Sequence, residues 1–169
     1  MTMITDPLPA GSNIIGRVRC TSDLIDVTLS LDTAIYASGD VLAATQEVAN
    51  AVDTAGGTAL LHSVVVLDKD DQGQPIDLVF LRSNVSIGTE NAAVSVSDTD
   101  AAEILGIVSV AAADFSDLGG CRVATLPSVG LVLKAGAGST SVYIAAVSKG
   151  TGTYSASGIV VKLGLAAQD

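Results

Sequence analysis

Few side chains of this chain could perform acid–base or nucleophilic chemistry. His62 is the single histidine among 169 residues. Catalytic triads, two-histidine metal sites and thiolate–imidazole pairs all need a histidine, or a substitute base, close to a nucleophile or a second ligand. His62 lies within the apolar run ALLHSVVV, between Leu61 and Ser63, so we interpret it as a structural residue of a strand.

The run DKDDQG resembles the start of a calcium-binding loop, because Asp68, Asp70 and Gly73 have the spacing D-x-D-x-x-G. The bidentate glutamate that closes such a loop should stand at position 79, where this chain has Val79. An acidic turn between two strands explains the run better, and a weak calcium site is the alternative.

Two other motifs have structural explanations. The stretch KAGAGST lacks the Gly-Lys-Ser/Thr order of a phosphate-binding loop and precedes a strand pattern, so we interpret it as a hairpin loop. Asp98, Asp100 and Glu103 gather where a short helix is expected to begin, and acidic side chains stabilise that end of a helix. We therefore predict no catalytic residues, no metal and no cofactor, and a protein that is not an enzyme.

The composition favours a structural protein. Apolar residues make up 49% of the chain and the mean hydropathy is +0.54, yet aromatic residues are only 3% and tryptophan is absent. The net charge is −10 and the eight basic residues are scattered, which excludes the basic patch that nucleic acid or an anionic membrane surface requires. Every apolar run is far shorter than the roughly 20 residues of a membrane helix. Cys20 and Cys121 are far apart and lack metal-ligand spacing, so free thiols are expected.

Residues 1–20 read as an extended arm that precedes one domain over residues 21–169. Pro7, Pro9, Gly11 and Gly16 disfavour a helix there. The first six residues also resemble the start of bacterial β-galactosidase, which cloning vectors append.

From residue 24 onward the hydrophobic period is two, which is typical of strands. In LIDVTLSL, Ile25, Val27, Leu29 and Leu31 share one face. Residues 59–67 and 75–81 are predicted to pair as a hairpin around DKDDQG. Residues 45–52 favour strand or loop. Further strands are predicted at residues 92–96, 107–112, 122–125, 129–135, 141–148 and 158–165.

One short helix is predicted over residues 98–105, capped by Asp98 or Thr99 and ended by Gly106. Eight or nine short strands separated by turn residues indicate an all-β, antiparallel β-sandwich or jelly roll. Residues 142–147 are apolar on both faces, so we expect a second copy of the chain to cover the outer face, formed by Tyr143, Ala145 and Val147.

Four segments resemble a known family: DVTLSLDTAIYASGDVLAATQEV, VVVLDKDDQGQPIDLVFL, AEILGIVSVAAADFSDLGG and SVYIAAVSKGTGTYSASGIVVKLGL. They are similar to small virion structural proteins encoded in the structural-gene regions of tailed bacteriophages, some of which act as capsid decoration (cement) proteins. The similarity covers the chain from residue 26 to its end. The matching residues are those of strands and turns, so they define no site.

The resemblance implies a β-rich homo-oligomer, expected to be a trimer, that binds the major capsid protein on the capsid surface of the virion after a period in the host cytoplasm during assembly. The arm falls outside the similarity. We expect its apolar residues to enter grooves between capsid subunits and its arginines to pair with shell carboxylates, which makes the capsid-contact residues Ile14, Ile15, Arg17, Val18 and Arg19.

Two other roles stay open. The same fold could belong to a tail, baseplate or head-fibre component of the virion. A surface adhesin or glycan-binding module is a further alternative, which the scarcity of aromatic residues disfavours.

Overall fold

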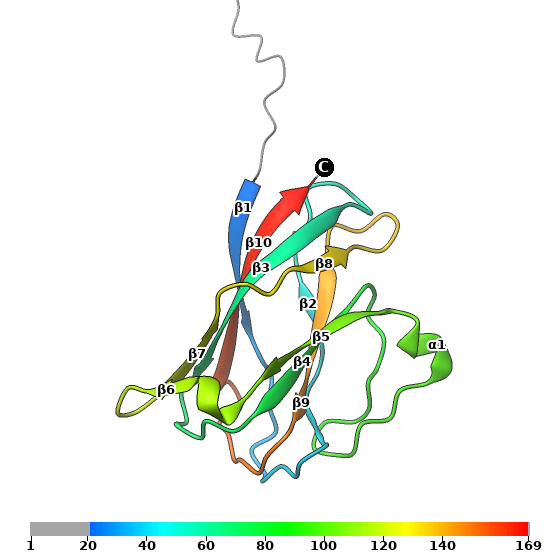
Figure 1. The fold of residues 1–169 in the computed structure, drawn as a ribbon. Coiled ribbons are helices and arrows are strands. Elements are labelled where there is room, and N and C mark those ends of the chain that lie inside the picture. Colours follow the sequence, from blue (N-terminus) through cyan, green and yellow to red (C-terminus); the bar gives the residue numbers. More distant parts are fainter. Residues whose placement is uncertain (1–20, 169) are drawn as a thin grey trace, which may run out of the picture.

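The computed structural model describes residues 21–168, which form a sandwich of two antiparallel sheets (Figure 1). This confirms the predicted all-β sandwich. The larger sheet has six strands: β1 (Thr21–Thr28), β3 (Thr58–Asp68), β6 (Phe115–Asp117), β7 (Arg122–Leu126), β8 (Leu131–Lys134) and β10 (Ile159–Gln168).

The smaller sheet has four strands: β2 (Val41–Val48), β4 (Ile76–Leu81), β5 (Ile104–Val110) and β9 (Val142–Ser148). A four-residue helix α1 (Asp98–Ala101) and a short 3₁₀ turn η1 (Ala112–Asp114) complete the described elements. The predicted arm, residues 1–20, lies outside the described residues.

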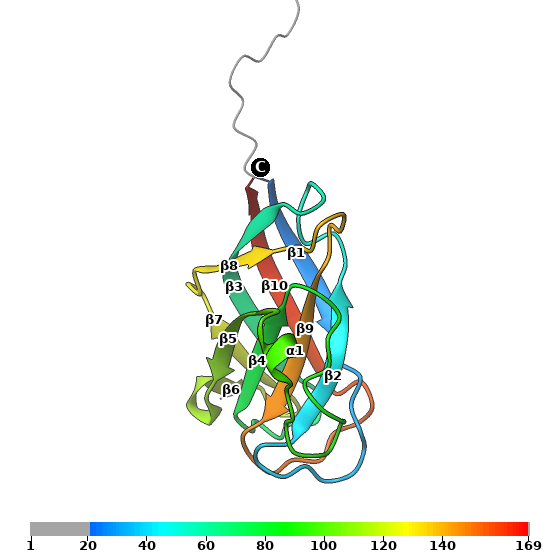
Figure 2. The same ribbon diagram turned by 90° about the vertical axis from the view of Figure 1, so that its right-hand side faces the viewer.

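Strands far apart in sequence lie side by side. The six-stranded sheet has the order β1-β10-β3-β7-β6, and β8 pairs with the start of β3 beside β7. The four-stranded sheet has the order β2-β9-β4-β5. Figure 2 shows β4, β9 and α1 in front of β3, β10 and β1, so the two sheets are stacked as layers.

The main core fills the space between the two sheets. Alternate residues of each strand point inward. On β3 the register shift at His62 interrupts this alternation, so the inward residues are Leu61, Val64 and Val66, and all three are fully buried. They meet Phe80 and Ile144 of the other sheet. The same alternation confirms the predicted inner face of residues 25–31.

A second core lies on the outer face of the four-stranded sheet. Residues 82–103, which include α1, cross this face in front of β4 and β9 (Figure 2). Ile87 from this segment is 1% exposed and packs with Val79 and Val147. The chain therefore buries this face by itself.

That packing corrects the expected role of β9. Ala145 is 0% and Val147 is 9% exposed, and both belong to the second core, on which half-buried Tyr143 also packs. The apolar outer face of β9 is covered by the chain's own residues 82–103, so it gives no support for a contact with a second copy there.

The predicted hairpin of residues 59–67 with 75–81 is wrong. β3 pairs with β10, β7 and β8, whereas β4 pairs with β5 and β9 in the other sheet. The DKDDQG turn therefore carries the chain from one layer to the other instead of returning it to a neighbouring strand.

The helix is shorter than predicted. Ser97, and not Asp98 or Thr99, caps α1, because its side chain accepts a hydrogen bond from the N–H of Asp100. The helix ends at Ala101 because Ile104 already pairs with Leu81 in the β4–β5 ladder. Residues 92–96 form no strand and contribute a single bridge from Ala93 to Asp40.

Candidate functional site: an apolar cleft on the four-stranded sheet

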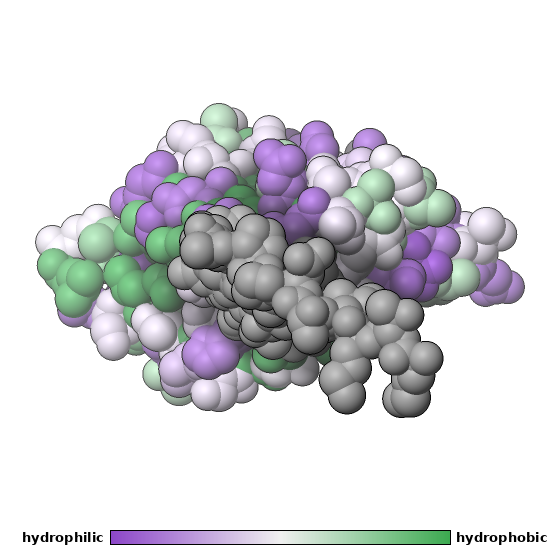
Figure 3. All heavy atoms as spheres, turned by 90° about the horizontal axis from the view of Figure 1, so that it is seen from above, coloured by the Kyte–Doolittle hydropathy of each residue, from purple (hydrophilic) through white to green (hydrophobic). Residues whose placement is uncertain are grey.

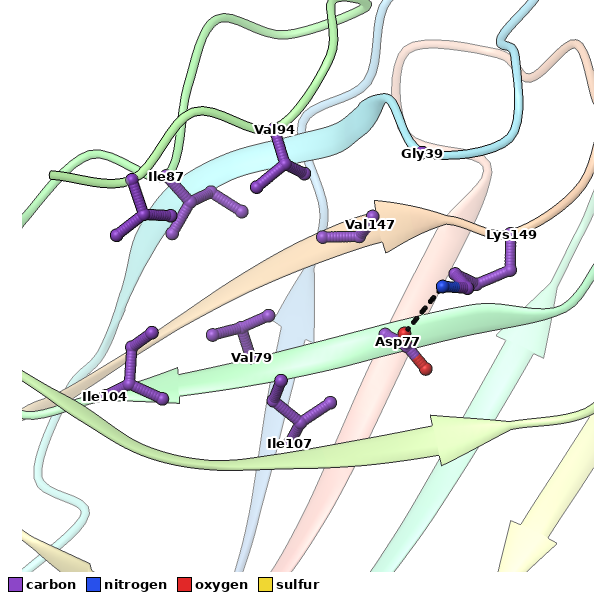
Figure 4. A pocket seen from close by; sticks show the side chains of 10 residues that line it. Gly39, Asp77, Val79, Ile87, Val94, Ile104, Ile107, Val147 and Lys149 are labelled. Carbon is purple, nitrogen blue, oxygen red and sulfur yellow. Dashed lines mark ion pairs between the residues drawn. The ribbon is translucent and has the colours of Figure 1, made fainter. Parts of the chain in front are cut away.

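An apolar cleft of about 320 Å³ opens beside the segment that covers the four-stranded sheet (Figure 4). Its floor comes from β4, β5 and β9, and its wall comes from residues 87–96. Its main lining side chains are Val79, Ile87, Val94, Ile104, Ile107 and Val147. A cleft of this size matches the small end of ligand pockets, and it suits one or two aliphatic side chains of a partner.

Two of these side chains form exposed lips of the cleft. Ile107 on β5 is 57% exposed and Val94 in the covering segment is 41% exposed. Single exposed aliphatic residues are common on proteins. These two border one cleft, so together they form a continuous apolar surface that a partner can cover.

One ion pair marks the polar end of the cleft. Lys149 Nζ lies 3.5 Å from a carboxylate oxygen of Asp77 on β4 (Figure 4). The Lys149 side chain is 50% exposed, so water screens the pair and its contribution to stability is small. It offers a donor and an acceptor at the rim, without a nucleophile–base pair.

Backbone hydrogen bonds fasten the wall of the cleft to the sheet. Val41 donates to the carbonyl of Ala92 and accepts from the N–H of Asn91. Val94 donates to the carbonyl of Gly39. Because these bonds join the covering segment to the start of β2, the cleft is a formed feature of the sandwich.

The acidic turn has a structural role. Asp68 is 1% exposed, and its carboxylate accepts hydrogen bonds from the N–H groups of Asp70 and Gly73. Asp70 in turn accepts from the backbone and the hydroxyl of Ser155. Within residues 21–168, no group of three or more His, Cys, Asp or Glu side chains is placed to hold a metal ion.

The remaining groups that could do chemistry lie apart from the cleft. His62 is an exposed residue of β3, at the point where the pairing with β10 shifts by one residue between Gly164 and Leu165. Cys121 is a half-buried free thiol next to Arg122, whose pKa is raised by its hydrogen bond to Asp71. Cys20 lies outside the described residues.

Two tyrosines pack together beneath the loops at one end of the sandwich. Their ring centres are 6.1 Å apart. Tyr36 donates a hydrogen bond to the carbonyl of Leu42 and accepts one from the N–H of Asp32. Burial raises the pKa of Tyr36, and burial followed by the charges of Asp68 and Asp70 raises the pKa of Tyr154. Both groups tie loops together.

The predicted site residues divide into two sets. The arm residues Ile14, Ile15, Arg17, Val18 and Arg19 lie outside the described residues. Of the expected interface residues, Tyr143 and Ala145 pack in the second core, and Val147 also lines the cleft. The sequence analysis missed Ile107 and Val94. For Ile107 the available signal was an aliphatic residue at an outward position of a strand, whereas Val94 lies outside any strand and carried no such signal.

No protein-family model matches the chain, and no curated protein matches it. Among the described residues, no helix is long and apolar enough to cross a membrane.

Proposed function

We propose that this protein is a non-enzymatic structural protein of a bacteriophage virion, a capsid decoration protein that binds the assembled shell as a homo-oligomer. Its partner is the major capsid protein. The observation that carries this proposal is the apolar cleft with its exposed lips, Ile107 and Val94. The buried carboxylate of Asp68 is used to hold a turn and not to do chemistry. The resemblance of the chain from residue 26 to its end to phage virion proteins supports the same role.

The mechanism is thermodynamic linkage. A protein that binds only the expanded, assembled shell stabilises that state by mass action. Each contact of one sandwich is weak, but an oligomer that engages several capsid subunits at once gains a large effective concentration. The rigid sandwich presents the contacts, and no bond is made or broken.

The arm supplies a second contact in this proposal. It precedes β1 in the sequence, and β1 is paired with β10 through eight register pairs and begins at one pole of the sandwich (Figure 1). Ile14, Ile15 and Val18 pack into grooves between capsid subunits, and Arg17 and Arg19 pair with shell carboxylates.

The test measures binding to shells purified from the bacteriophage that carries the gene. The full chain should co-sediment with expanded shells at high copy number. Replacing both arginines, Arg17→Glu and Arg19→Glu, should lower the bound copies about tenfold or more, because each ion pair becomes a repulsion. Lys69→Glu is the charge-matched control for each single change, Arg17→Glu or Arg19→Glu, because it alters the net charge by the same two units and Lys69 is exposed in the turn after β3.

Two outcomes contradict the proposal. A full chain that does not co-sediment with shells would end the decoration role. Quantitative gels of purified virions give the second measurement, because hundreds of copies per particle are expected of a decoration protein. A few copies, located by immunolabelling at the tail or baseplate, would place the protein elsewhere in the virion. If the arginine variant binds like the Lys69 control, the arm has no part in the contact.

A further inference from the structure

The outer face of the six-stranded sheet carries several aliphatic residues. Strand register places Val160 of β10, Leu67 of β3 and Val123 of β7 in one row across this face. The next row contains Val65, between Lys162 and Thr125. These valine and leucine side chains form a continuous aliphatic patch near the end of β3 and the start of β10.

A second apolar band lies further along the same strands. Leu60 of β3 stands between Ala166 of β10 and Val132 of β8. Leu24 on the edge strand β1 is 61% exposed and Val132 is 58% exposed. We call this whole surface, formed by the outward residues of β1, β10, β3, β7 and β8, the open face.

Within residues 21–168, no element covers the open face. Its half-buried residues Leu60, Val65, Leu67, Val123 and Val160 pack against neither of the two cores. The covering segment and α1 lie on the far side of the other sheet (Figures 1 and 2). Seen from the pole where β1 begins, hydrophobic residues gather on the side of β6 and β7 (Figure 3). Among the described residues, one sheet is thus covered by its own chain and the other is not.

Charge decides which partner fits this face. The chain carries 18 acidic and 8 basic residues, so two copies repel each other over most of their surfaces. Among the outward residues of the open face, Asp26 is the only acidic one, and its carboxylate is paired with Lys162 at 2.6 Å. Lys134 adds a positive charge. A basic partner would find almost no unpaired acidic side chain to bind on the open face. A second copy of this acidic chain would meet little electrostatic repulsion there, because acidic charge is almost absent from this face.

The size of the open face also fits a second copy. Four neighbouring strands about 4.8 Å apart, with the ten-residue length of β10, project to roughly 600 Å². Side chains standing on a sheet raise the accessible area above this projection. The face therefore approaches the roughly 800 Å² per partner that a stable interface buries.

We propose that two copies of this chain pack through their open faces, with Leu67, Val160 and Val123 inside the contact. A surface that packs against itself does so about a twofold axis. The inference therefore predicts a dimer as the unit of assembly and not the trimer expected from the family resemblance. It deepens the proposed homo-oligomer, and it is measured on the purified protein alone, so its failure would leave capsid binding untouched.

The test is sedimentation of the full chain over a range of micromolar concentrations. The natural sequence should sediment as a dimer. Leu67→Glu should raise the dissociation constant about a hundredfold or more, because each copy would bury an unpaired charge in the contact. Ile35→Glu is the matched control, because Ile35 is an exposed aliphatic residue of the loop between β1 and β2, away from the open face and the cleft, and it should leave the dimer intact.

A gentler variant guards against misfolding of Leu67→Glu. Val123→Thr combined with Val160→Thr keeps the shape and the strand preference of both residues, and circular dichroism should show an unchanged fold. Its dimer should also be weaker. A monomer at every concentration, a trimer, or a dimer that Leu67→Glu and the threonine variant leave unaffected would each overturn the inference. A monomer would assign the open face to the arm or to the capsid.

Discussion

The carboxylate of Asp68 accepts a 2.7 Å hydrogen bond from the backbone N–H of Gly73, five residues further along the chain. The same carboxylate accepts a bond from the N–H of Asp70. Because Asp68 is buried at the end of β3, these bonds close the turn through which the chain leaves the six-stranded sheet for β4. The acidic run that resembles a calcium loop is thus a turn that connects a strand of one sheet to a strand of the other.

Removing the charge of Asp68 should destabilise the fold. In Asp68→Asn one acceptor oxygen becomes an N–H₂ donor, which leaves a buried backbone N–H without an acceptor, so we expect a loss of about 1–3 kcal/mol. Asp71→Asn, in the same turn, is the control. It removes an exposed ion pair with Arg122, and its loss should stay within about 1 kcal/mol. Urea unfolding measures both, and equal losses would contradict this role of Asp68.

Because Ala145 is buried within a single chain, a charge at this position should lower the stability of the monomer. At an interface between two copies, the same charge would instead change the oligomeric state. Ala145→Glu places a charge in the second core and should destabilise the monomer itself by about 3 kcal/mol or more. Ala44→Glu, the same change at an exposed position of β2, should stay within about 0.5 kcal/mol. If Ala145→Glu unfolds like the natural sequence and alters only the oligomeric state, the covering by residues 82–103 is wrong.

The local alternation of apolar and polar residues predicted most strands, because the apolar positions of a strand show which of its faces is buried. The alternation of Ile25, Val27 and Leu29, and of the β3 residues, depends only on which side meets a core. The sheet to which a strand belongs depends on distant residues. β3 and β4 are both rich in apolar residues and joined by a turn, so a hairpin satisfied every local rule, but pairing with β10 and β9 decided the result.

The same limit applies to the surfaces. An apolar outer face on β9 shows that something covers it, without showing whether the cover is another copy or residues 82–103 of the same chain. For β3 the pattern was equally apolar, and there the described chain provides no cover. Only the position of the covering segment separates the two cases, and that position is fixed by long-range hydrogen bonds such as Val41 to Ala92.

The two buried tyrosines predict a loss of stability at alkaline pH. Burial raises the pKa of Tyr36 and Tyr154 in the folded state above the ordinary tyrosine value of about 10. Above that pH the unfolded chain releases these protons first, so unfolding is increasingly favoured. Stability should be complete below about pH 10 and fall above it, by about 1.4 kcal/mol per pH unit for each tyrosine.

Urea unfolding of the natural sequence and of Tyr154→Phe between neutral and strongly alkaline pH tests this. In this variant the free energy of unfolding should fall less steeply with pH above about pH 10, by the contribution of one tyrosine. In Tyr36→Phe combined with Tyr154→Phe, the contributions of both tyrosines should be missing. Tyr36→Phe should also be less stable at neutral pH, because the carbonyl of Leu42 and the N–H of Asp32 lose their partner. An unchanged alkaline slope in the double variant would show that other groups cause the loss.

Two glycines beside the apolar cleft test how tightly the covering segment is held. Both have positive φ, +97° at Gly39 and +133° at Gly88, so alanine is strained at either position. They differ in space. A Cβ at Gly39 would meet nothing within 4 Å, whereas one at Gly88 would lie 3.0 Å from Val41 Cγ2 and 3.1 Å from the backbone nitrogen of Ser95.

Gly39→Ala should therefore show the backbone strain alone, about 1–2 kcal/mol, and Gly88→Ala should lose more because the segment must also move away from buried Val41. That movement opens the cleft and exposes Ile87. We expect limited proteolysis to cut within residues 82–97 of Gly88→Ala well before it cuts Gly39→Ala, at temperatures where both stay folded. Equal resistance of the two variants would mean that contact with Val41 does not hold the segment, and the cleft would then have to be regarded as open in solution.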